Sequence, residues 1–176
     1  LANDGITEFR QGREKIALLC LKESSLIYQD GKTFALLGDI YYKGGEMRRA
    51  LFYWHRAKLL DPLDKSISPK LKRVIKEIRL ADSAKAIELP HFEVKYKESL
   101  PIDADLVASI LEKAYFDIGK DLAYFPKTKT KVLFYSNSDF KNIFKMPVMV
   151  RAFYDGSIRI PVPDRRLGQE EFSRHI

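Results

Sequence analysis

Bulky and small residues recur at fixed spacings between Gly31 and Pro62, and this spacing constrains the fold more than any other feature of the sequence. Counted from Gly31 as the first position of a 34-residue unit, these residues are Phe34, Leu37, Gly38, Tyr41, Ala50, Trp54, Ala57 and Pro62. Phe34, Leu37 and Tyr41 share one face of a predicted helix. Gly38 and Ala50 are small, which lets a second, antiparallel helix cross the first one closely. Gly44 and Gly45 predict the turn between them.

This set of residues resembles the tetratricopeptide repeat at every signature position. A weaker copy lies one repeat length earlier, with its matching places at Leu1, Gly5, Gly12, Ala17, Leu21 and Ser24. That copy departs from the pattern at Asp4 and Glu8, where apolar residues are expected. The sequence therefore predicts two helical hairpins over residues 1–62, the first of them degenerate.

Residues 68–83 predict one further helix after the second hairpin. Ser68 is its predicted N-cap, and Pro69 suits the first helical position. The predicted apolar face is formed by Leu71, Val74, Ile75 and Ile78, and the other face carries Lys and Arg. A helix with one apolar face and one charged face is what the end of a repeat array requires.

The resemblance to tetratricopeptide repeats implies a binding scaffold whose concave surface takes a protein or peptide ligand. The positions that would line this surface are Ala2, Ile6, Phe9, Arg10, Lys32, Ala35, Asp39, Tyr42 and Lys43. Ala35 and Asp39 stand where family members that grip a C-terminal carboxylate have Lys and Asn, which disfavours that ligand. The alternative left open is that the two repeats only support the neighbouring domain.

The second half of the chain mixes strands and helices. We expect a strand at 91–96, a helix from about 102 to 123, a central strand at 131–135 and a short helix from Ser136 to about Phe144. Asp155-Gly156 predicts a hairpin, whose second arm ends at Pro161 and Pro163, and a last helix starts at Gly168. The expected fold is thus a helical repeat unit (1–62), a capping helix and linker (63–88) and an α+β domain with a mostly antiparallel or mixed sheet (89–176).

The blocks HFEVKY, ILEKAYFDIGKDLAYFP, KVLFYSNSDF and FYDGSIRIPV make residues 90–176 look like the N-terminal part of a peptidase-MA-like, gluzincin-type zinc metallopeptidase domain. That family binds zinc through H-E-x-x-H on a helix, a motif that this sequence lacks. The resemblance implies that the motif would follow residue 176, so no catalytic residue, metal ligand or cofactor is assigned here. It also implies a substrate-pairing edge strand at Ser157, Ile158, Arg159 and Ile160, with Arg159 as an ordinary surface residue the alternative.

Charge and composition limit the remaining alternatives. The net charge of +7 favours acidic partners, and the basic stretch from Lys70 to Arg79 keeps nucleic-acid binding open as a third hypothesis, although no aromatic residues accompany it for base stacking. The single cysteine, Cys20, excludes an internal disulfide, and no apolar run is long enough for a membrane span. We expect a soluble protein of bacterial cytoplasm or envelope that acts as an interaction scaffold. A fragment of an active zinc metallopeptidase and a homodimer through the C-terminal segment stay open.

Overall fold

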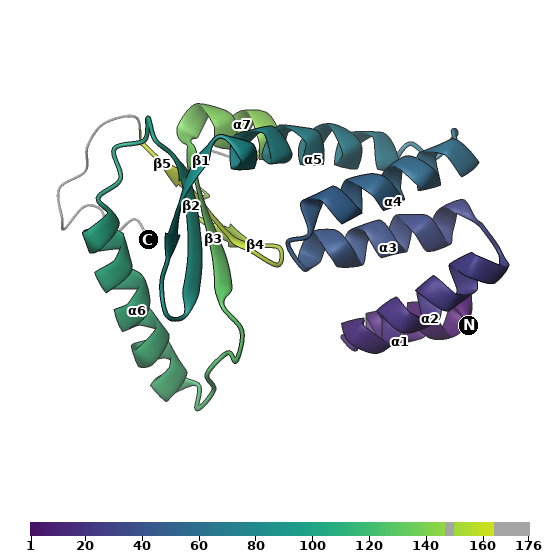
Figure 1. Ribbon diagram of the computed structural model, residues 1–176, viewed down its shortest axis with the longest axis horizontal. Helices are drawn as coiled ribbons and strands as arrows, with labels where there is room; N and C mark the ends of the chain where they lie inside the picture. Colours follow the sequence, from purple (N-terminus) through teal and green to yellow (C-terminus); the bar gives the residue numbers. More distant parts are fainter. Residues whose placement is uncertain (147–149, 164–176) are drawn as a thin grey trace. The chain divides into compact units, whose positions relative to one another are not determined.

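The computed structural model describes residues 1–146 and 150–163, and the chain divides into two compact units, Leu1–Ile78 and Arg79–Ile176. The first unit is helical and the second carries a mixed sheet with helices, so the protein belongs to the α+β class (Figure 1). The division falls inside a helix, before the predicted start of the α+β domain at residue 89. The predicted helix from Gly168 lies outside the described residues.

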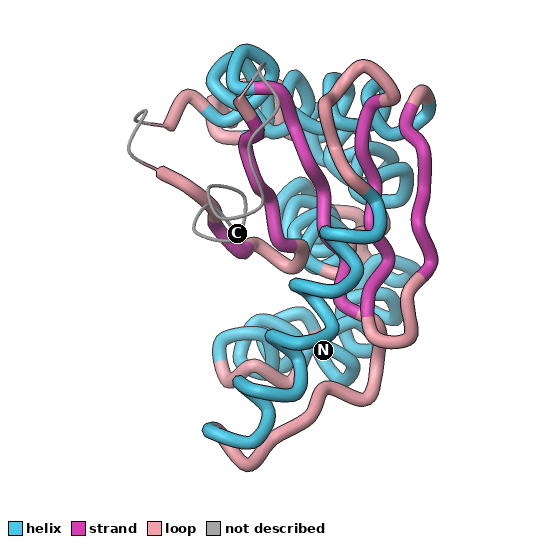
Figure 2. Tube along the Cα trace, turned by 90° about the vertical axis from the view of Figure 1, so that its left-hand side faces the viewer, coloured by secondary structure: helices cyan, strands magenta, loops and turns pink. Residues whose placement is uncertain are grey.

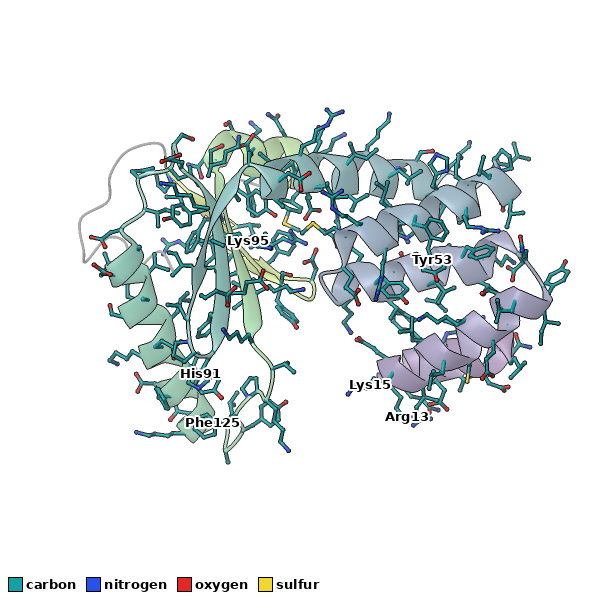
Figure 3. All side chains as sticks on the ribbon, viewed as in Figure 1. Arg13, Lys15, Tyr53, His91, Lys95 and Phe125 are labelled. Atoms are coloured by element: carbon teal, nitrogen blue, oxygen red, sulfur yellow. The ribbon has the colours of Figure 1, made fainter. Side chains whose placement is uncertain are left out.

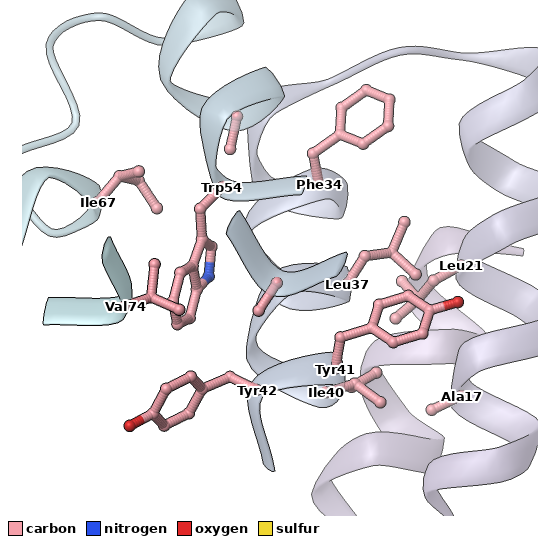
Figure 4. Packing of buried hydrophobic residues seen from close by; sticks show 12 residues of the cluster. Ala17, Leu21, Phe34, Leu37, Ile40, Tyr41, Tyr42, Trp54, Ile67 and Val74 are labelled. Atoms are coloured by element: carbon pink, nitrogen blue, oxygen red, sulfur yellow. The ribbon is translucent and has the colours of Figure 1, made fainter. Parts of the chain in front are cut away.

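The second helical hairpin forms as predicted. Helices α3 (Gly31–Lys43) and α4 (Met47–Leu60) are joined by a turn in which Gly45 has a φ of 71°. A Cβ atom on Gly38 would lie 2.3 Å from the Trp54 ring, so only glycine permits this crossing. Phe34, Leu37 and Trp54 are buried in the core of the unit (Figure 4).

The first hairpin repeats this packing with smaller residues. Helices α1 (Ala2–Arg10) and α2 (Glu14–Ile27) meet where a Cβ atom on Gly5 would lie 2.6 Å from Leu21, which takes the place of Trp54 in this hairpin. Ala17 is fully buried, as is Ala50 at the same place in the second hairpin. Gly12 has a positive φ of 75°, matching Gly45. The two hairpins therefore share one packing scheme, repeated one unit later along the chain.

Helix α5 (Ile67–Asp82) follows the hairpins and begins earlier than predicted. Ser68 lies inside its first turn, so the predicted N-cap role of Ser68 is wrong. Val74 packs beside the Trp54 ring (Figure 4). Leu71 and Ile78 contact the same core. Ile75 was predicted on this apolar face but is exposed, because the buried face is rotated toward Ile67, Val74 and Glu77.

The second unit is built on a sheet whose order is β1-β2-β3-β5-β4 among the described residues (Figure 2). Its strands are β1 (Ala84–Glu88), β2 (Phe92–Lys97), β3 (Thr130–Ser136), β4 (Phe153–Tyr154) and β5 (Ile158–Val162). The β2–β3 and β3–β5 pairs are parallel, and the two outer pairs are antiparallel. The prediction of a mixed sheet with a central strand at 131–135 is confirmed.

Two of the described helices pack on the sheet. Successive side chains of β3 point to opposite faces, and each face contacts one of the two helices. Val132 and Phe134 join the cluster that contains Val107 and Leu111 of α6 (Ala104–Asp121). Tyr135, which points the other way, contacts the rings of Phe140 and Phe144 from α7 (Asn137–Phe144). Asp103 accepts hydrogen bonds at the start of α6, and Ser136, the predicted first residue of the short helix, does so at the start of α7.

Two parts of the sheet differ from expectation. Residues 84–88 were predicted as linker but form β1, which pairs with β2 along its whole length. Pro161 was predicted to end the second hairpin arm, yet β5 continues through it to Val162. Beyond Arg159 no described strand pairs with the outer side of β5, and proline is tolerated at such positions.

Candidate functional site

The predicted concave surface is partly covered by α5. The phenol of Tyr42 is buried and donates a hydrogen bond of 2.5 Å to the carboxylate of Glu77 on α5. Asp39 accepts hydrogen bonds from the indole of Trp54 at 2.9 Å and from the ammonium of Lys70 at 2.6 Å. The prediction that Tyr42 is accessible to a ligand is therefore wrong, because α5 packs on this part of α3.

Glu77 is the centre of this contact, with a side chain only 1% exposed. The guanidinium of Arg73 lies 3.5 Å from its carboxylate and stacks over the Tyr42 ring at 4.5 Å. A buried carboxylate needs such partners, because burying a charge without hydrogen bonds or an opposite charge nearby costs several kcal/mol of folding free energy. Sequence reasoning missed Glu77, because it stands in a basic stretch that indicated a solvated face.

The other residues predicted to line the concave surface differ in how far they are exposed. Arg10 and Lys32 are exposed, while Phe9 packs partly against the helical core. Lys43 is exposed and forms an ion pair with Glu14 of the first hairpin. Ala35 is half-buried, and its carbonyl oxygen accepts from the Trp54 indole at 3.2 Å. Of the predicted concave residues, Arg10, Lys32 and Lys43 are thus exposed, while Ala2, Ile6 and Phe9 are partly buried.

The basic stretch on α5 does not form one solvated face either. Lys70 is engaged with Asp39, and Arg73 with Glu77 and Tyr42. Lys72 and Lys76 are exposed. Two of the basic side chains that suggested nucleic-acid binding are therefore used to hold α5 on the helical core.

An open apolar groove of about 730 Å³ lies between α4 and α5, on residues that the sequence did not single out as a site. Phe52, Leu59 and Leu60 remain 54%, 69% and 46% exposed there. The residues that line it are Arg48, Leu51, Phe52, His55, Arg56, Leu59, Leu60 and Ile75. A signal was present in the sequence, since Phe52, Leu59 and Leu60 recur at a two-turn helical spacing, away from the face of Ala50, Trp54 and Ala57.

The predicted substrate-edge strand is not a free edge at its start. Ile158 and Arg159 pair with Tyr154 and Phe153 of β4, so β5 lies between two strands there. Ser157 precedes β5 and is buried, and Ile160 is buried with the core. The edge prediction is therefore wrong for Ile158 and Arg159, because β4, the first arm of the hairpin that turns at Asp155-Gly156, pairs with the outer side of β5.

Arg159 is fully buried, which also overturns the alternative of a surface residue. Its guanidinium donates to Asp155 at 2.7 Å and to the Tyr135 hydroxyl at 2.7 Å, and it lies 5.2 Å from the centre of the Phe144 ring. These contacts tie the hairpin to β3 and α7. The arrangement is that of a structural ion pair inside the α+β unit.

A second polar cluster of the α+β unit joins His91, the residue before β2, to α6. The His91 ring stacks on Tyr115 with a centroid distance of 3.7 Å, and its Nδ1 lies 2.5 Å from a carboxylate oxygen of Glu112. The His91 backbone N–H donates to the other oxygen at 3.0 Å. Burial raises the pKa of Glu112, but these hydrogen bonds from His91 outweigh it, so that the pKa lies below its ordinary value. Figure 3 shows His91 and Phe125 at the same end of α6.

Among the described residues, no three or more His, Cys, Asp and Glu side chains gather at distances that could hold a metal ion. None of the helices in the described part of the chain combines the length and the apolar character needed to cross a bilayer. No protein-family model, no curated protein and no solved structure matches this chain.

Proposed function

We propose that this chain is a protein-interaction scaffold, with residues 1–78 as a short array of the tetratricopeptide type that binds a protein or peptide. The support is the packing scheme that both hairpins share, in which Gly5 meets Leu21 as Gly38 meets Trp54. On its sequence resemblance alone, the α+β unit is proposed as the non-catalytic N-terminal portion of a peptidase-MA-like domain.

The observation that carries the proposal is the apolar surface of α4. Phe52, Leu59 and Leu60 stay largely exposed along one groove, although the core of the helical unit is filled by other residues. Apolar side chains gathered on a surface depression are typical of a binding site. Helical repeats also supply rigid surfaces on which such contacts are held in place.

The proposal is tested by selecting peptides from a random display library against the intact chain. We expect enriched peptides that bind one to one in calorimetry with micromolar affinity. Hydrogen exchange measured with and without each peptide locates its site on the chain, and we expect slower exchange within residues 1–78.

Two results would contradict the scaffold function. One is a selection that enriches no binding peptide. The other is a set of peptides whose binding slows exchange only within residues 79–163, because the helical unit would then not be the binding part.

A further inference from the structure

The groove between α4 and α5 is long enough to take a short helix. Its α4 side runs from Arg48 to Leu60, a stretch of about 18 Å at 1.5 Å per residue. Ile75 of α5 forms the opposite wall. A groove of this length accommodates about three turns of a partner helix, whose apolar anchors recur at i, i+3, i+4 and i+7.

The charged side chains that line the groove are of one sign. Arg48, His55 and Arg56 are the charged or titratable residues among the described side chains that line it, and all three are basic types. The guanidinium of Arg56 is held in place 4.8 Å from the centre of the Phe34 ring and donates to Gln29 at 2.9 Å. Lys72 is exposed on α5 three positions before Ile75, hence on the same side of that helix.

We infer that this groove binds an acidic amphipathic helix from a protein partner. Its apolar side chains pack on Phe52, Leu59 and Leu60, and its carboxylates face Arg48, Arg56 and Lys72. The inference rests on the proposed scaffold function and adds the surface and the chemistry of the partner. It places the ligand on α4 and α5 rather than on the predicted concave residues Arg10 and Lys32.

The apolar lining distinguishes this partner from other acidic ones. A groove for single-stranded nucleic acid combines cations with several aromatic side chains on which successive bases stack. The apolar side chains of this groove are instead four aliphatic ones, Leu51, Leu59, Leu60 and Ile75, and the single phenyl ring of Phe52. A partner that combines apolar anchors with carboxylates uses both features of the groove, and an amphipathic helix presents them on adjoining faces.

The test titrates the intact chain with three fluorescent 14-residue peptides. The first is an amphipathic helix with Leu at i, i+3, i+4 and i+7 and Glu on the flanks. The second replaces every Glu by Lys, and the third keeps the acidic composition but has a central proline that prevents a helix. We expect the first to bind at least tenfold more tightly than the other two, with an affinity that falls between 50 and 200 mM salt.

Surface variants locate the site. Phe52→Ser, Leu59→Ser and Arg48→Glu should each weaken binding of the acidic helix at least fivefold. The matched control is Leu26→Ser, which removes an 85% exposed leucine from the place in the first hairpin that Leu59 takes in the second. This control should leave binding unchanged, and circular dichroism should show all four variants folded.

Several outcomes overturn the inference. These are equal binding of the acidic and basic helices, equal losses in Leu26→Ser and Leu59→Ser, or no binding of the acidic helix while library peptides bind elsewhere on residues 1–78. Tighter binding to DNA or anionic vesicles that Phe52→Ser abolishes would assign the groove to those ligands. Self-association of the wild type that Phe52→Ser removes would assign it to a second copy. If no peptide binds in either experiment, the scaffold function fails as well.

Discussion

The distance between α3 and α4 is set by the missing side chain of Gly38. A Cβ atom there would lie 2.3 Å from the Trp54 ring, so we expect even Gly38→Ala to force the helices apart. The expected loss is about 1–3 kcal/mol in the free energy of unfolding. Trp54 is the single tryptophan, and its fluorescence during urea unfolding reports this unit directly.

Gly44→Ala is the control for this prediction, because a Cβ atom at Gly44 meets only two backbone oxygens, at 3.5 and 3.6 Å. Its φ of −71° is open to any residue. We expect Gly44→Ala to change stability by less than about 0.5 kcal/mol or to increase it slightly. Equal midpoints for Gly38→Ala and the wild type would mean that the helices do not cross as closely as described.

The pair of His91 and Glu112 predicts a pH-dependent contribution to the α+β unit. The pKa of Glu112 is lowered in the folded chain, because the hydrogen bonds from His91 outweigh the effect of burial. A group with a lowered pKa stabilises the fold above its unfolded value, about 4.3, and this stabilisation is lost as pH falls through the folded pKa. Glu112→Gln should therefore be less stable than the wild type at pH 7, and the difference should shrink below about pH 4.

Hydrogen exchange of the α6 amides between pH 3 and 7 measures this difference. His91→Phe keeps a ring against Tyr115 but removes the side-chain hydrogen bond, so it should reproduce part of the effect of Glu112→Gln. A difference between Glu112→Gln and the wild type that stays constant across this range would show that ionisation of Glu112 does not contribute to the stability of the α+β unit.

At the scale of elements, α5 is held to α3 by polar contacts as well as by apolar packing. Tyr42→Phe removes the donor to the buried carboxylate of Glu77, which should lower the free energy of unfolding by about 1–3 kcal/mol. Tryptophan fluorescence during urea unfolding measures this loss. The control is Tyr28→Phe, which removes the hydroxyl of a residue that is 72% exposed and should leave the free energy of unfolding unchanged.

A double-mutant cycle of Tyr42→Phe with Glu77→Met tests the hydrogen bond itself, and we expect a coupling energy of at least about 0.5 kcal/mol between the two substitutions. Additive effects would show that the hydrogen bond does not hold α5.

The elements that the sequence predicted are those whose ends carry a capping side chain or a turn glycine. Asp103 and Ser136 cap α6 and α7 through their own side chains, and Gly45 adopts the positive φ that its turn requires. Strand β1 carried no such signal, because Ala84–Glu88 is short, follows a helix almost directly and is defined by its pairing with β2. The residues of β1 alone therefore did not indicate a strand, because the strand depends on its hydrogen bonds to β2.

The candidate site was less predictable than the fold, because it depends on how helices pack against one another and not on a local signal within one helix. The repeat pattern located the faces of α3 but not the position of α5, which buries Tyr42 and leaves Ile75 on the groove. Glu77 and Arg159 are charged residues that only the folded chain shows to be buried. A small rotation of α5 relative to its predicted face was enough to change which surface is open.

At the scale of the molecule, the helical and α+β units have separate hydrophobic clusters that share no residue. Leu37→Ala, at a fully buried site, should lower the unfolding midpoint read by Trp54 fluorescence, with a cost of about 2–5 kcal/mol. It should leave hydrogen exchange in β2 and β3 unchanged. Leu111→Ala, whose site is 4% exposed in the other cluster, should do the reverse and speed exchange in the sheet at an unaltered fluorescence midpoint. If either variant moves both readouts equally, the chain unfolds as one cooperative body, and a ligand on α4 would then stabilise the sheet as much as the repeats.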